Sequence, residues 1–248
     1  MQWIWPLLAA PLAGSFLGVL ITRLPQGRPV AVGRSACEAC GTTLKAWDMV
    51  PLLSYAALRG RCRACGAGIA PLHWHVELAA LLIPASAALA GLAGPALWLA
   101  CGLGWTLLAL AWIDCNTMLL PDVLTLPLIP AGLLAAWWLD PAGLTDHAIA
   151  AALGYAVLAG VAFGYRWLRG RDGLGGGDPK LLAALGAWIG VAALPSVLLG
   201  AALAGLAWAG LLRLRGTALT GSTALPFGPF LALSGWLVLL QAWTDAAL

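Results

Sequence analysis

Two aspartates, Asp114 and Asp178, are the residues of this chain whose positions favour chemistry. Asp114 ends an apolar run and begins the polar segment 114–122, and Asp178 follows the three glycines 175–177. A carboxylate beside hydrocarbon is costly, so an ionisable residue in such a place is by default a functional hypothesis. Two carboxylates that face the same water can share one proton and activate that water, which is the chemistry of aspartic proteases.

The composition indicates that the elements holding these aspartates lie in a membrane. The 248 residues are 62% hydrophobic and 9% charged, against roughly 45–50% and about 25% in soluble domains, and the mean hydropathy is +0.91. A spanning helix needs about 20 apolar residues. Eight runs of about that length occur, at 3–22, 75–92, 96–113, 123–139, 147–167, 179–195, 196–212 and 225–243. We therefore expect an all-α polytopic membrane protein with about eight transmembrane helices; the boundary at Leu194-Pro195-Ser196 is the weakest.

The basic residues predict the orientation. All thirteen lie in three segments: Arg23, Arg28, Arg34, Lys45, Arg59, Arg61 and Arg63; then Arg166, Arg169, Arg171 and Lys180; then Arg213 and Arg215. By the positive-inside rule all three segments are cytoplasmic. Eight crossings with both termini outside the cytoplasm satisfy this rule for every Lys and Arg. The basic clusters thus indicate membrane topology, and we do not expect nucleic-acid binding, their other interpretation.

The longest hydrophilic segment, residues 23–74, contains two CxxC pairs. Cys37 and Cys40 form the first, Cys62 and Cys65 the second, and 21 residues separate the pairs. This spacing is close to that of four-cysteine zinc sites, which are tetrahedral, closed and structural. A segment this small also needs a metal or disulfides for support. The alternative is two disulfides, which the expected cytoplasmic location disfavours.

The segment 168–180 has a structural interpretation beside the functional one. Its glycines, Gly173 and 175–177, permit backbone conformations closed to other residues and are typical of a flexible linker. Asp178 precedes Pro179 at a helix start, so it is also a candidate helix cap, as is Asp122 after Pro121. Two expected crossings separate Asp114 from Asp178 in the chain, so both return to the cytoplasmic face. Two same-face aspartates, one in a Gly-x-Gly-Asp sequence, favour catalysis over capping.

Four motifs in order resemble those of bacterial type IV prepilin peptidases, intramembrane aspartic proteases of the Gly-x-Gly-Asp class that usually also N-methylate their product. The motifs are Gly14-Ser15-Phe16-Leu17-Gly18-Val19 with Arg23-Leu24-Pro25; Trp47-Asp48-Met49-Val50-Pro51-Leu52-Leu53-Ser54-Tyr55 with Leu58-Arg59-Gly60-Arg61-Cys62-Arg63; Ile113-Asp114 through Leu120-Pro121-Asp122-Val123-Leu124-Thr125-Leu126-Pro127; and Gly175-Gly176-Gly177-Asp178-Pro179-Lys180-Leu181-Leu182. The resemblance covers nearly the whole chain, and the double CxxC lies where the family has it.

The resemblance implies a function. It places the catalytic aspartates at Asp114 and Asp178, with supporting positions at Asp122, Gly175, Gly177 and Lys180. The substrates would be prepilins or pseudopilins of a type II secretion system, cut after the terminal Gly of a basic leader. S-adenosylmethionine would then methylate the new amino terminus; the sequence has no Gly-rich nucleotide fold for this cofactor and assigns no residues to it. The expected location is the bacterial inner membrane.

Two places depart from the family's pattern, both in the loop that the resemblance links to methylation, so a peptidase without methylation is an alternative. Met49 stands where the family usually has Asn, and His73-Trp74-His75 replaces the common Arg-Tyr-Pro. The histidines are expected to be interfacial polar groups and Trp74 an interfacial anchor. Glu77 is a candidate for coupling the loop to the membrane region, because an unpaired carboxylate near lipid is costly; the alternative is that it is solvated at the interface.

These observations predict three domains and leave two rivals to the peptidase. The domains are a first transmembrane helix at 1–22, a zinc-binding loop at 23–74 and a membrane-embedded peptidase at 75–248. A transporter also uses carboxylates in helices, but its sites lie near the bilayer midplane, whereas these aspartates lie at helix ends. A zinc-stabilised membrane scaffold, with the aspartates as caps, is the non-enzymatic rival.

Overall fold

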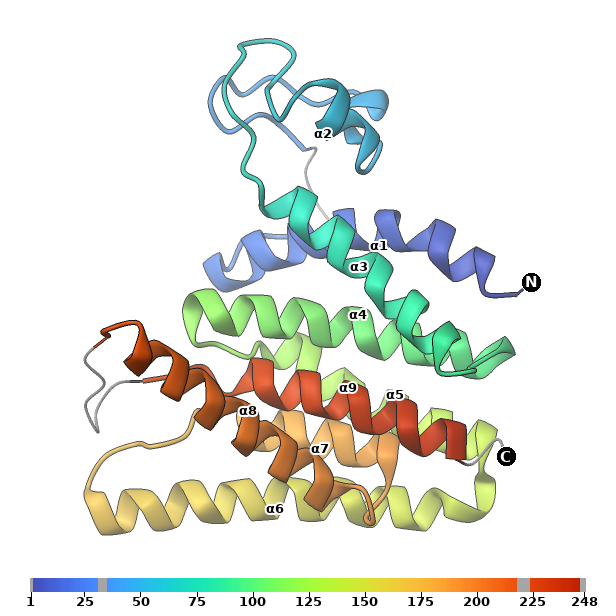
Figure 1. The fold of residues 1–248 in the computed structure, drawn as a ribbon, viewed down its shortest axis with the longest axis vertical. Helices are drawn as coiled ribbons and strands as arrows, with labels where there is room; N and C mark the ends of the chain where they lie inside the picture. The colour runs from blue at the N-terminus through green and yellow to red at the C-terminus, as the bar shows by residue number, and fades with distance from the viewer. Residues whose placement is uncertain (1, 31–34, 218–223, 246–248) are drawn as a thin grey trace. The chain divides into compact units, whose positions relative to one another are not determined.

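The computed structural model describes residues 2–30, 35–217 and 224–245, and within them the regular secondary structure is helical, with two isolated β-bridges besides. The prediction of an all-α protein is confirmed. Arg34, one of the basic residues used for orientation, lies outside the described residues. The elements are α1 (Ile4–Arg23), η1 (Leu24–Gln26), η2 (Ala46–Met49), α2 (Leu53–Ala57), α3 (Leu72–Leu89), α4 (Gly94–Thr117), α5 (Asp122–Leu139), η3 (Pro141–Gly143), α6 (Leu144–Arg169), α7 (Asp178–Ile189), α8 (Leu194–Leu214) and α9 (Gly228–Asp245) (Figure 1).

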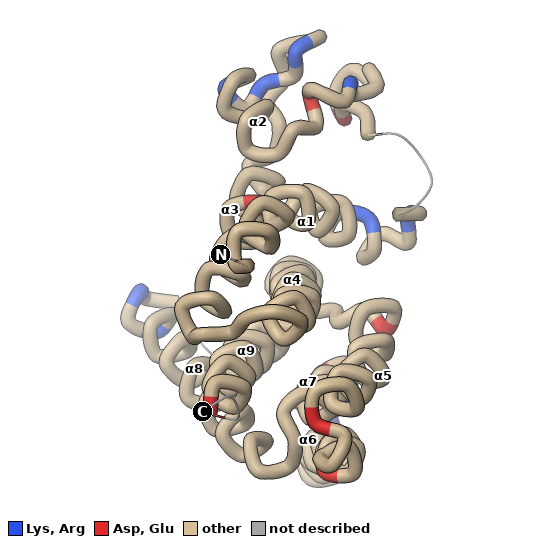
Figure 2. The backbone as a smooth tube through the Cα atoms, turned by 90° about the vertical axis from the view of Figure 1, so that its right-hand side faces the viewer, with Lys and Arg blue, Asp and Glu red and all other residues tan. Residues whose placement is uncertain are grey.

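Among the described residues, six helices are long and apolar enough to cross a membrane: α1, α3, α4, α5, α6 and α8. The other two of the eight expected runs form α7 and α9. At 12 residues, α7 is only about 18 Å long, less than the roughly 30 Å of a hydrocarbon core. The sixth and seventh runs are separate helices, since α7 ends at Ile189 and α8 begins at Leu194. Charged residues are sparse along the six helices, and the basic ones lie in connecting segments or at helix ends (Figure 2).

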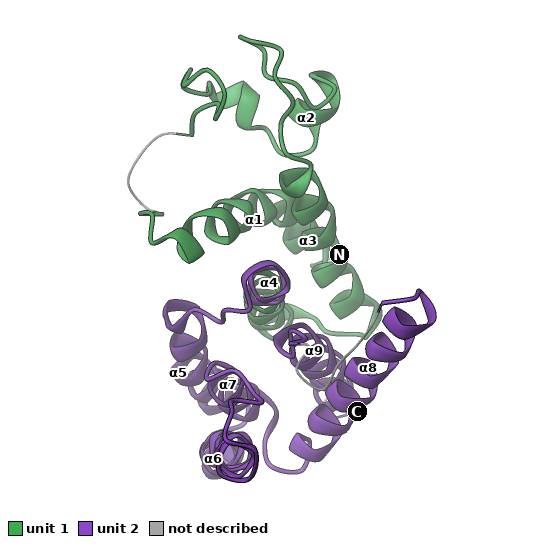
Figure 3. Ribbon diagram, turned by 90° about the vertical axis from the view of Figure 1, so that its left-hand side faces the viewer, with its two compact units in different colours: residues 1–109 green, residues 110–248 purple. Residues whose placement is uncertain are grey.

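The chain divides into two compact units, Met1–Ala109 and Leu110–Leu248 (Figure 3). In the first unit, α1 and α3 pack as an antiparallel pair at two glycines. A Cβ added to Gly14 would lie 2.6 Å from the Cα of Glu77, and one added to Gly18 would lie 2.5 Å from the ring of His73. Both positions therefore need the small residue for close helix contact, as small-xxx-small spacing predicts.

The second unit is organised around α7. Every residue from Asp178 to Ile189 except Lys180 is buried, and α5, α6 and α9 surround the helix (Figure 3). The neighbours approach closely because glycines face it: Gly132 of α5 faces Trp188, Gly154 of α6 faces the Leu182 carbonyl, and Gly235 of α9 faces Leu185. A helix that is apolar on all sides is buried on all sides, which explains why this run resembled a transmembrane span in the sequence.

The end of α7 opposite Asp178 is held by α6. Asp146 Oδ2 accepts a hydrogen bond from the Val191 N–H at 2.9 Å, and the His147 ring lies 3.0 Å from the Ala187 carbonyl oxygen. The backbone just after α7 is thereby tied to the first turn of α6. These contacts limit sliding of α7 along its neighbours, so its Asp178 end keeps a fixed position in the unit.

A glycine-to-alanine pair in α6 tests the packing of α7. A Cβ at Gly154 would lie 2.7 Å from the Leu182 carbonyl oxygen, whereas one at Gly160 would meet nothing within 4 Å. Overpacking typically costs about 1–3 kcal/mol, so we expect Gly154→Ala to lower the Tm of the purified protein by at least about 3 °C. Gly160→Ala is the control and should leave the Tm unchanged or raised. Equal Tm values for the two variants would contradict the close α6–α7 contact.

Candidate active site and metal cluster

Asp114 lies in the last turn of α4 and is 5% exposed. Its Oδ2 accepts a hydrogen bond from the backbone N–H of Gly228, the first residue of α9, at 3.0 Å. The chain leaves α4 at Met118, which has a φ of 54°, a left-handed conformation uncommon for a residue with a side chain. This turn ends α4 and directs the following residues back across the Asp114 carboxylate, where Leu119 and Leu120 line the same pocket.

Asp178 is the first residue of α7 and is also 5% exposed. Its Oδ2 accepts a hydrogen bond from the Gly175 N–H at 3.1 Å. The residue at the N-cap position of α7 is Gly177, and no side chain forms a capping hydrogen bond there. Asp178 therefore does not act as the helix cap. Asp178 lies outside the six candidate spans; burial and the nearby Asp114 charge raise its pKa to about 7, and the Gly175 bond opposes this.

Both carboxylates line one pocket of about 170 Å³ within the second unit. The lining residues are Asp114, Met118, Leu119, Leu120, Asp122, Gly175, Gly176, Gly177, Asp178 and Lys180. Residues 64 positions apart are thus brought together, as the count of crossings predicted. A water occupies about 30 Å³, so the pocket has room for a water beside the two carboxylates. Chemically, the arrangement suits activation of that water.

The glycines before Asp178 are needed for space. Gly175 and Gly177 are absent from the positive-φ residues, so their conformations are open to other residue types. A Cβ at Gly177 would instead lie 2.5 Å from the Leu120 Cβ, and one at Gly175 would lie 3.0 Å from Asp178 Oδ2. The Gly-x-Gly spacing lets the segment before α7 pass against the segment after α4, which closes the pocket.

Asp122 and Lys180 form an ion pair beside the pocket. Lys180 Nζ donates to both carboxylate oxygens of Asp122, at 2.6 and 2.8 Å. The position before α5 is Pro121, and no side chain caps the helix there, so capping is not the role of Asp122. The side chains are 30% and 54% exposed for Lys180 and Asp122, and exposed pairs contribute only about 0–1 kcal/mol to stability. The pair's importance is positional: it joins the first turns of α5 and α7 at the pocket.

Sequence analysis missed one contributor, Gly228. The signal was present, because Pro226 and Pro229 bracket the residue just where the last apolar run begins, and proline before or at a helix start is positional information. The segment has no cluster of chemically active side chains, so side-chain chemistry alone had no reason to select it.

The four cysteines of the two CxxC pairs form one cluster. The sulfurs of Cys37, Cys40, Cys62 and Cys65 all lie within 4.8 Å of one another, and the Cys37 and Cys65 sulfurs are 3.8 Å apart. All four are free thiols, which contradicts the disulfide alternative. Zinc–sulfur bonds of about 2.3 Å in a tetrahedron separate the sulfurs by about 3.8 Å. The donor set and its spacing therefore fit a tetrahedral metal ion.

Each CxxC pair folds into the same small loop. In the first, Cys37 N–H donates to the Thr42 carbonyl at 2.9 Å and Gly41 N–H to the Cys37 carbonyl at 2.8 Å; the second repeats this with Cys62, Ala67 and Gly66 at 2.8 and 2.9 Å. Gly41 and Gly66 have φ of 69° and 72°, where a side chain is disfavoured. The repeated unit is thus C-x-x-C-G, which adds one glycine to each CxxC pair.

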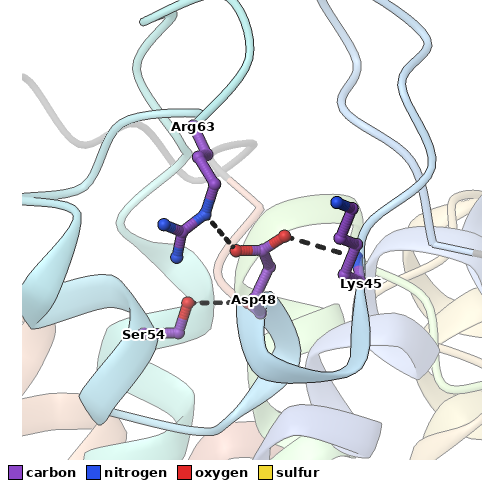
Figure 4. Close-up of polar contacts among 4 residues, drawn as sticks. All are labelled: Lys45, Asp48, Ser54 and Arg63. Atoms are coloured by element: carbon purple, nitrogen blue, oxygen red, sulfur yellow. Dashed lines mark hydrogen bonds and ion pairs between the residues drawn. The ribbon is translucent and has the colours of Figure 1, made fainter.

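Asp48 ties the second of these loops to the helical turn η2 (Figure 4). Its Oδ1 accepts a hydrogen bond from Arg63 Nε at 2.8 Å, and its Oδ2 accepts one from the Lys45 N–H at 3.3 Å. The Ser54 hydroxyl donates to the Asp48 carbonyl oxygen at 2.8 Å. The Arg63 bond lowers the pKa of Asp48. Because Arg63 lies between Cys62 and Cys65, this carboxylate aligns one half of the four-cysteine cluster.

Glu77 connects the residue 23–74 segment, which we call the cysteine loop, to α3. It is 5% exposed, and its Oε2 accepts a hydrogen bond from the Leu52 N–H at 2.8 Å. Leu52 has a φ of 61°, so the bond holds an otherwise unfavourable turn. Trp74, expected as an interfacial anchor, stacks on Tyr55 of α2 with ring centroids 5.4 Å apart. Glu77 is therefore buried and paired, which departs from the alternative of a solvated carboxylate.

The fold and these sites define a polytopic membrane protein with a buried carboxylate pair and a four-cysteine cluster. Two family models match the chain: the bacterial peptidase A24 N-terminal domain over residues 8–90 and the type IV leader peptidase family over residues 101–210. The first region includes the four cysteines and Glu77, and the second includes Asp114 and Asp178. No solved structure matches the chain.

Curated relatives match over most of their length, and each is called a prepilin leader peptidase/N-methyltransferase. The protein of Burkholderia pseudomallei strain 1026b is 44% identical over 95% of this chain and 84% of its own. Those of Aeromonas salmonicida strain A449 and Pseudomonas aeruginosa are 40% and 38% identical, each over 94% of this chain and 88% of its own. The chain belongs to the type IV leader peptidase family.

Removal of one thiolate tests the metal cluster. We expect about one metal ion per chain in protein purified without chelator, because four thiolates make a complete site. Cys65→Ser should lose this metal and make the cysteine loop more sensitive to protease, since metal binding and folding are coupled. Cys115→Ser, which changes an exposed thiol outside the cluster, is the control. Elemental analysis that finds no metal in the unaltered protein would remove the site.

Proposed function

We propose that this chain removes the leader of type IV prepilins or type II secretion pseudopilins and then N-methylates the new amino terminus. The observation that carries the proposal is that Asp114 and Asp178, each 5% exposed, line one pocket. The names of the relatives, prepilin leader peptidase/N-methyltransferase, agree with it. The scissile bond would follow the Gly that ends the basic leader.

The two aspartates would divide acid and base roles. The ionised carboxylate takes a proton from the bound water while the water oxygen bonds to the scissile carbonyl carbon. The protonated carboxyl then gives its proton to the departing amide nitrogen. One carboxyl of the pair keeps its proton as the acid while the other is ionised as the base. Their charges interact, so the pair titrates as a unit.

The remaining residues of the pocket would support this pair. Gly175 holds the Asp178 carboxylate through its N–H, and Gly177 permits the close contact with Leu120. The Asp122–Lys180 pair would set the distance between α5 and α7 where substrate enters. None of these groups needs to exchange a proton during cleavage.

The second activity would belong to the cysteine loop. The domains would be a first transmembrane helix at 1–22, this loop at 23–74 and the peptidase at 75–248. The metal would be zinc in a structural role, because four thiolates leave no open position for chemistry. The methyl donor would be S-adenosylmethionine, for which the described geometry assigns no residues. Glu77 would align the loop with α3 through the Leu52 N–H. Asp48 would align two parts of the loop with each other through Arg63.

The proposed orientation follows from charge. The chain is a multi-pass protein of the bacterial inner membrane, and its basic segments would lie in the cytoplasm, with both termini in the periplasm. In the second unit, the C-terminal ends of α6 and α8, which carry Arg169 and Arg213, lie at the same end of the helices in Figure 1. Asp114 is in the last turn of α4, so the pocket would open near this membrane surface rather than at a transporter's midplane.

Amide replacements test the acid pair. Asp114→Asn and Asp178→Asn should each reduce cleavage of a membrane-embedded prepilin by at least about a hundredfold, because Asn keeps the size but exchanges no proton. Product masses measure cleavage. Asp172→Asn, at an exposed residue paired with Arg166, is the control and should cleave normally. Near-normal cleavage by either pocket variant would remove the aspartic mechanism and favour the scaffold.

Glu77→Gln tests the link between the loop and α3. Hydrogen bonds to charged groups contribute about 1.5–3 kcal/mol, roughly twice neutral ones. We therefore expect methylated product to fall by about fivefold while cleavage, measured in the same spectra, stays within about twofold. Glu38→Gln, at the exposed glutamate of the first CxxC loop, is the control. A larger loss of cleavage than of methylation would contradict the assigned role.

A further inference from the structure

Gly228 contacts one of the two pocket carboxylates from outside the pocket lining. Its N–H donates to Asp114 Oδ2 at 3.0 Å in a buried setting. The residue begins α9, after residues 224–227 that have no regular structure. It lies beyond residues 101–210, the part of the chain that matches the type IV leader peptidase family model.

The local backbone makes this N–H available. The first N–H groups of a helix have no partner within the helix, and in α9 the first helical bonds run from Phe230 and Leu231 to the Phe227 carbonyl oxygen. The Gly228 N–H precedes them and points at Asp114 instead. A carboxylate at this position is also favoured by the positive end of the helix dipole.

The position requires glycine for reasons of space. Gly228 is absent from the positive-φ residues, so its conformation is open to alanine. A Cβ there, however, would lie 2.7 Å from Asp114 Oδ2 and 3.0 Å from a methyl carbon of Leu120. Any side chain at 228 must displace the carboxylate, the Leu120 side chain that lines the pocket, or the start of α9.

The two carboxylates are held in the same way. Asp178 Oδ2 accepts the Gly175 N–H and Asp114 Oδ2 accepts the Gly228 N–H. In each case the donor is a glycine at which a Cβ would come within 3.0 Å of the bonded oxygen. One glycine belongs to the Gly-x-Gly-Asp segment; the other is reached only through the fold.

We infer that Gly228 is a positioning residue for Asp114: its N–H holds the carboxylate, and the lack of a side chain at 228 leaves the carboxylate in place. The inference rests on the proposed peptidase function, because it gives Gly228 a role only through Asp114. A purely structural role, in which Gly228 serves α9 packing alone, is the alternative that the test must separate.

Gly228→Ala tests the inference by kinetics. A displacement of about 1 Å at a reacting group costs about a hundredfold in rate, so kcat for prepilin cleavage should fall by at least tenfold with KM within twofold. Methylation of a pilin supplied already cleaved should be unchanged. Gly210→Ala in α8, where a Cβ meets nothing within 4 Å, is the control. If the unaltered protein cleaves and Gly228→Ala cleaves equally well, the inference is overturned; if the unaltered protein does not cleave, the proposed function fails instead.

A stability cycle keeps the test valid if Gly228→Ala is too unstable for kinetics. The Tm drop caused by Gly228→Ala should be smaller in an Asp114→Ala background, because the carboxylate that the new Cβ meets is then absent. Coupled neighbours deviate from additivity in this way. Equal Tm drops in both backgrounds would assign the effect to α9 packing and overturn the inference.

Discussion

The cost of keeping two carboxylates next to apolar helices constrains the whole second unit. Asp114 and Asp178 are each 5% exposed, and a buried carboxylate needs hydrogen bonds or a shared proton to be tolerated. The structure meets this need at one end of the helices, where the segment before α7 and the first residue of α9 supply N–H groups. Glycine is required at both donors because the backbone itself, rather than a side chain, must reach the carboxylate.

The burial of α7 follows from the same need. Asp178 can face Asp114 only if α7 lies inside the unit, and a short helix can lie there only if its neighbours have room for it. Gly132, Gly154 and Gly235 provide that room from three helices, while Trp188 anchors the helix by donating to the Leu128 carbonyl at 2.9 Å. The packing of α7 against these three helices therefore determines where Asp178 lies.

In the first unit, a few contacts give the small polar cysteine loop a defined conformation. Within the described part of the cysteine loop, Cys62 is the one buried apolar side chain, so the order of the loop depends on the four-cysteine cluster and on a few polar contacts. Asp48 fixes one CxxC loop, and Glu77 fixes the turn at Leu52 to α3. Gly14 allows this because α1 packs directly against the backbone of Glu77, which keeps the carboxylate away from both lipid and water.

The all-α membrane class, the aspartate pair and the cysteine set could be predicted from the sequence, because they depend on apolar run length and on residue types at short spacing. The count of crossings predicted one face for Asp114 and Asp178, since an even number of crossings returns the chain to the same side, and helix packing then brings both to one pocket. Other features depend on contacts between distant segments: α7 is a buried 12-residue helix, Glu77 is paired rather than solvated, and Asp122 bonds Lys180 instead of capping α5. Gly228 belongs to this second group as well. Its N–H donates a hydrogen bond to a residue 114 positions away. Every residue type except proline has such an N–H, so the residue type at 228 does not indicate this contact.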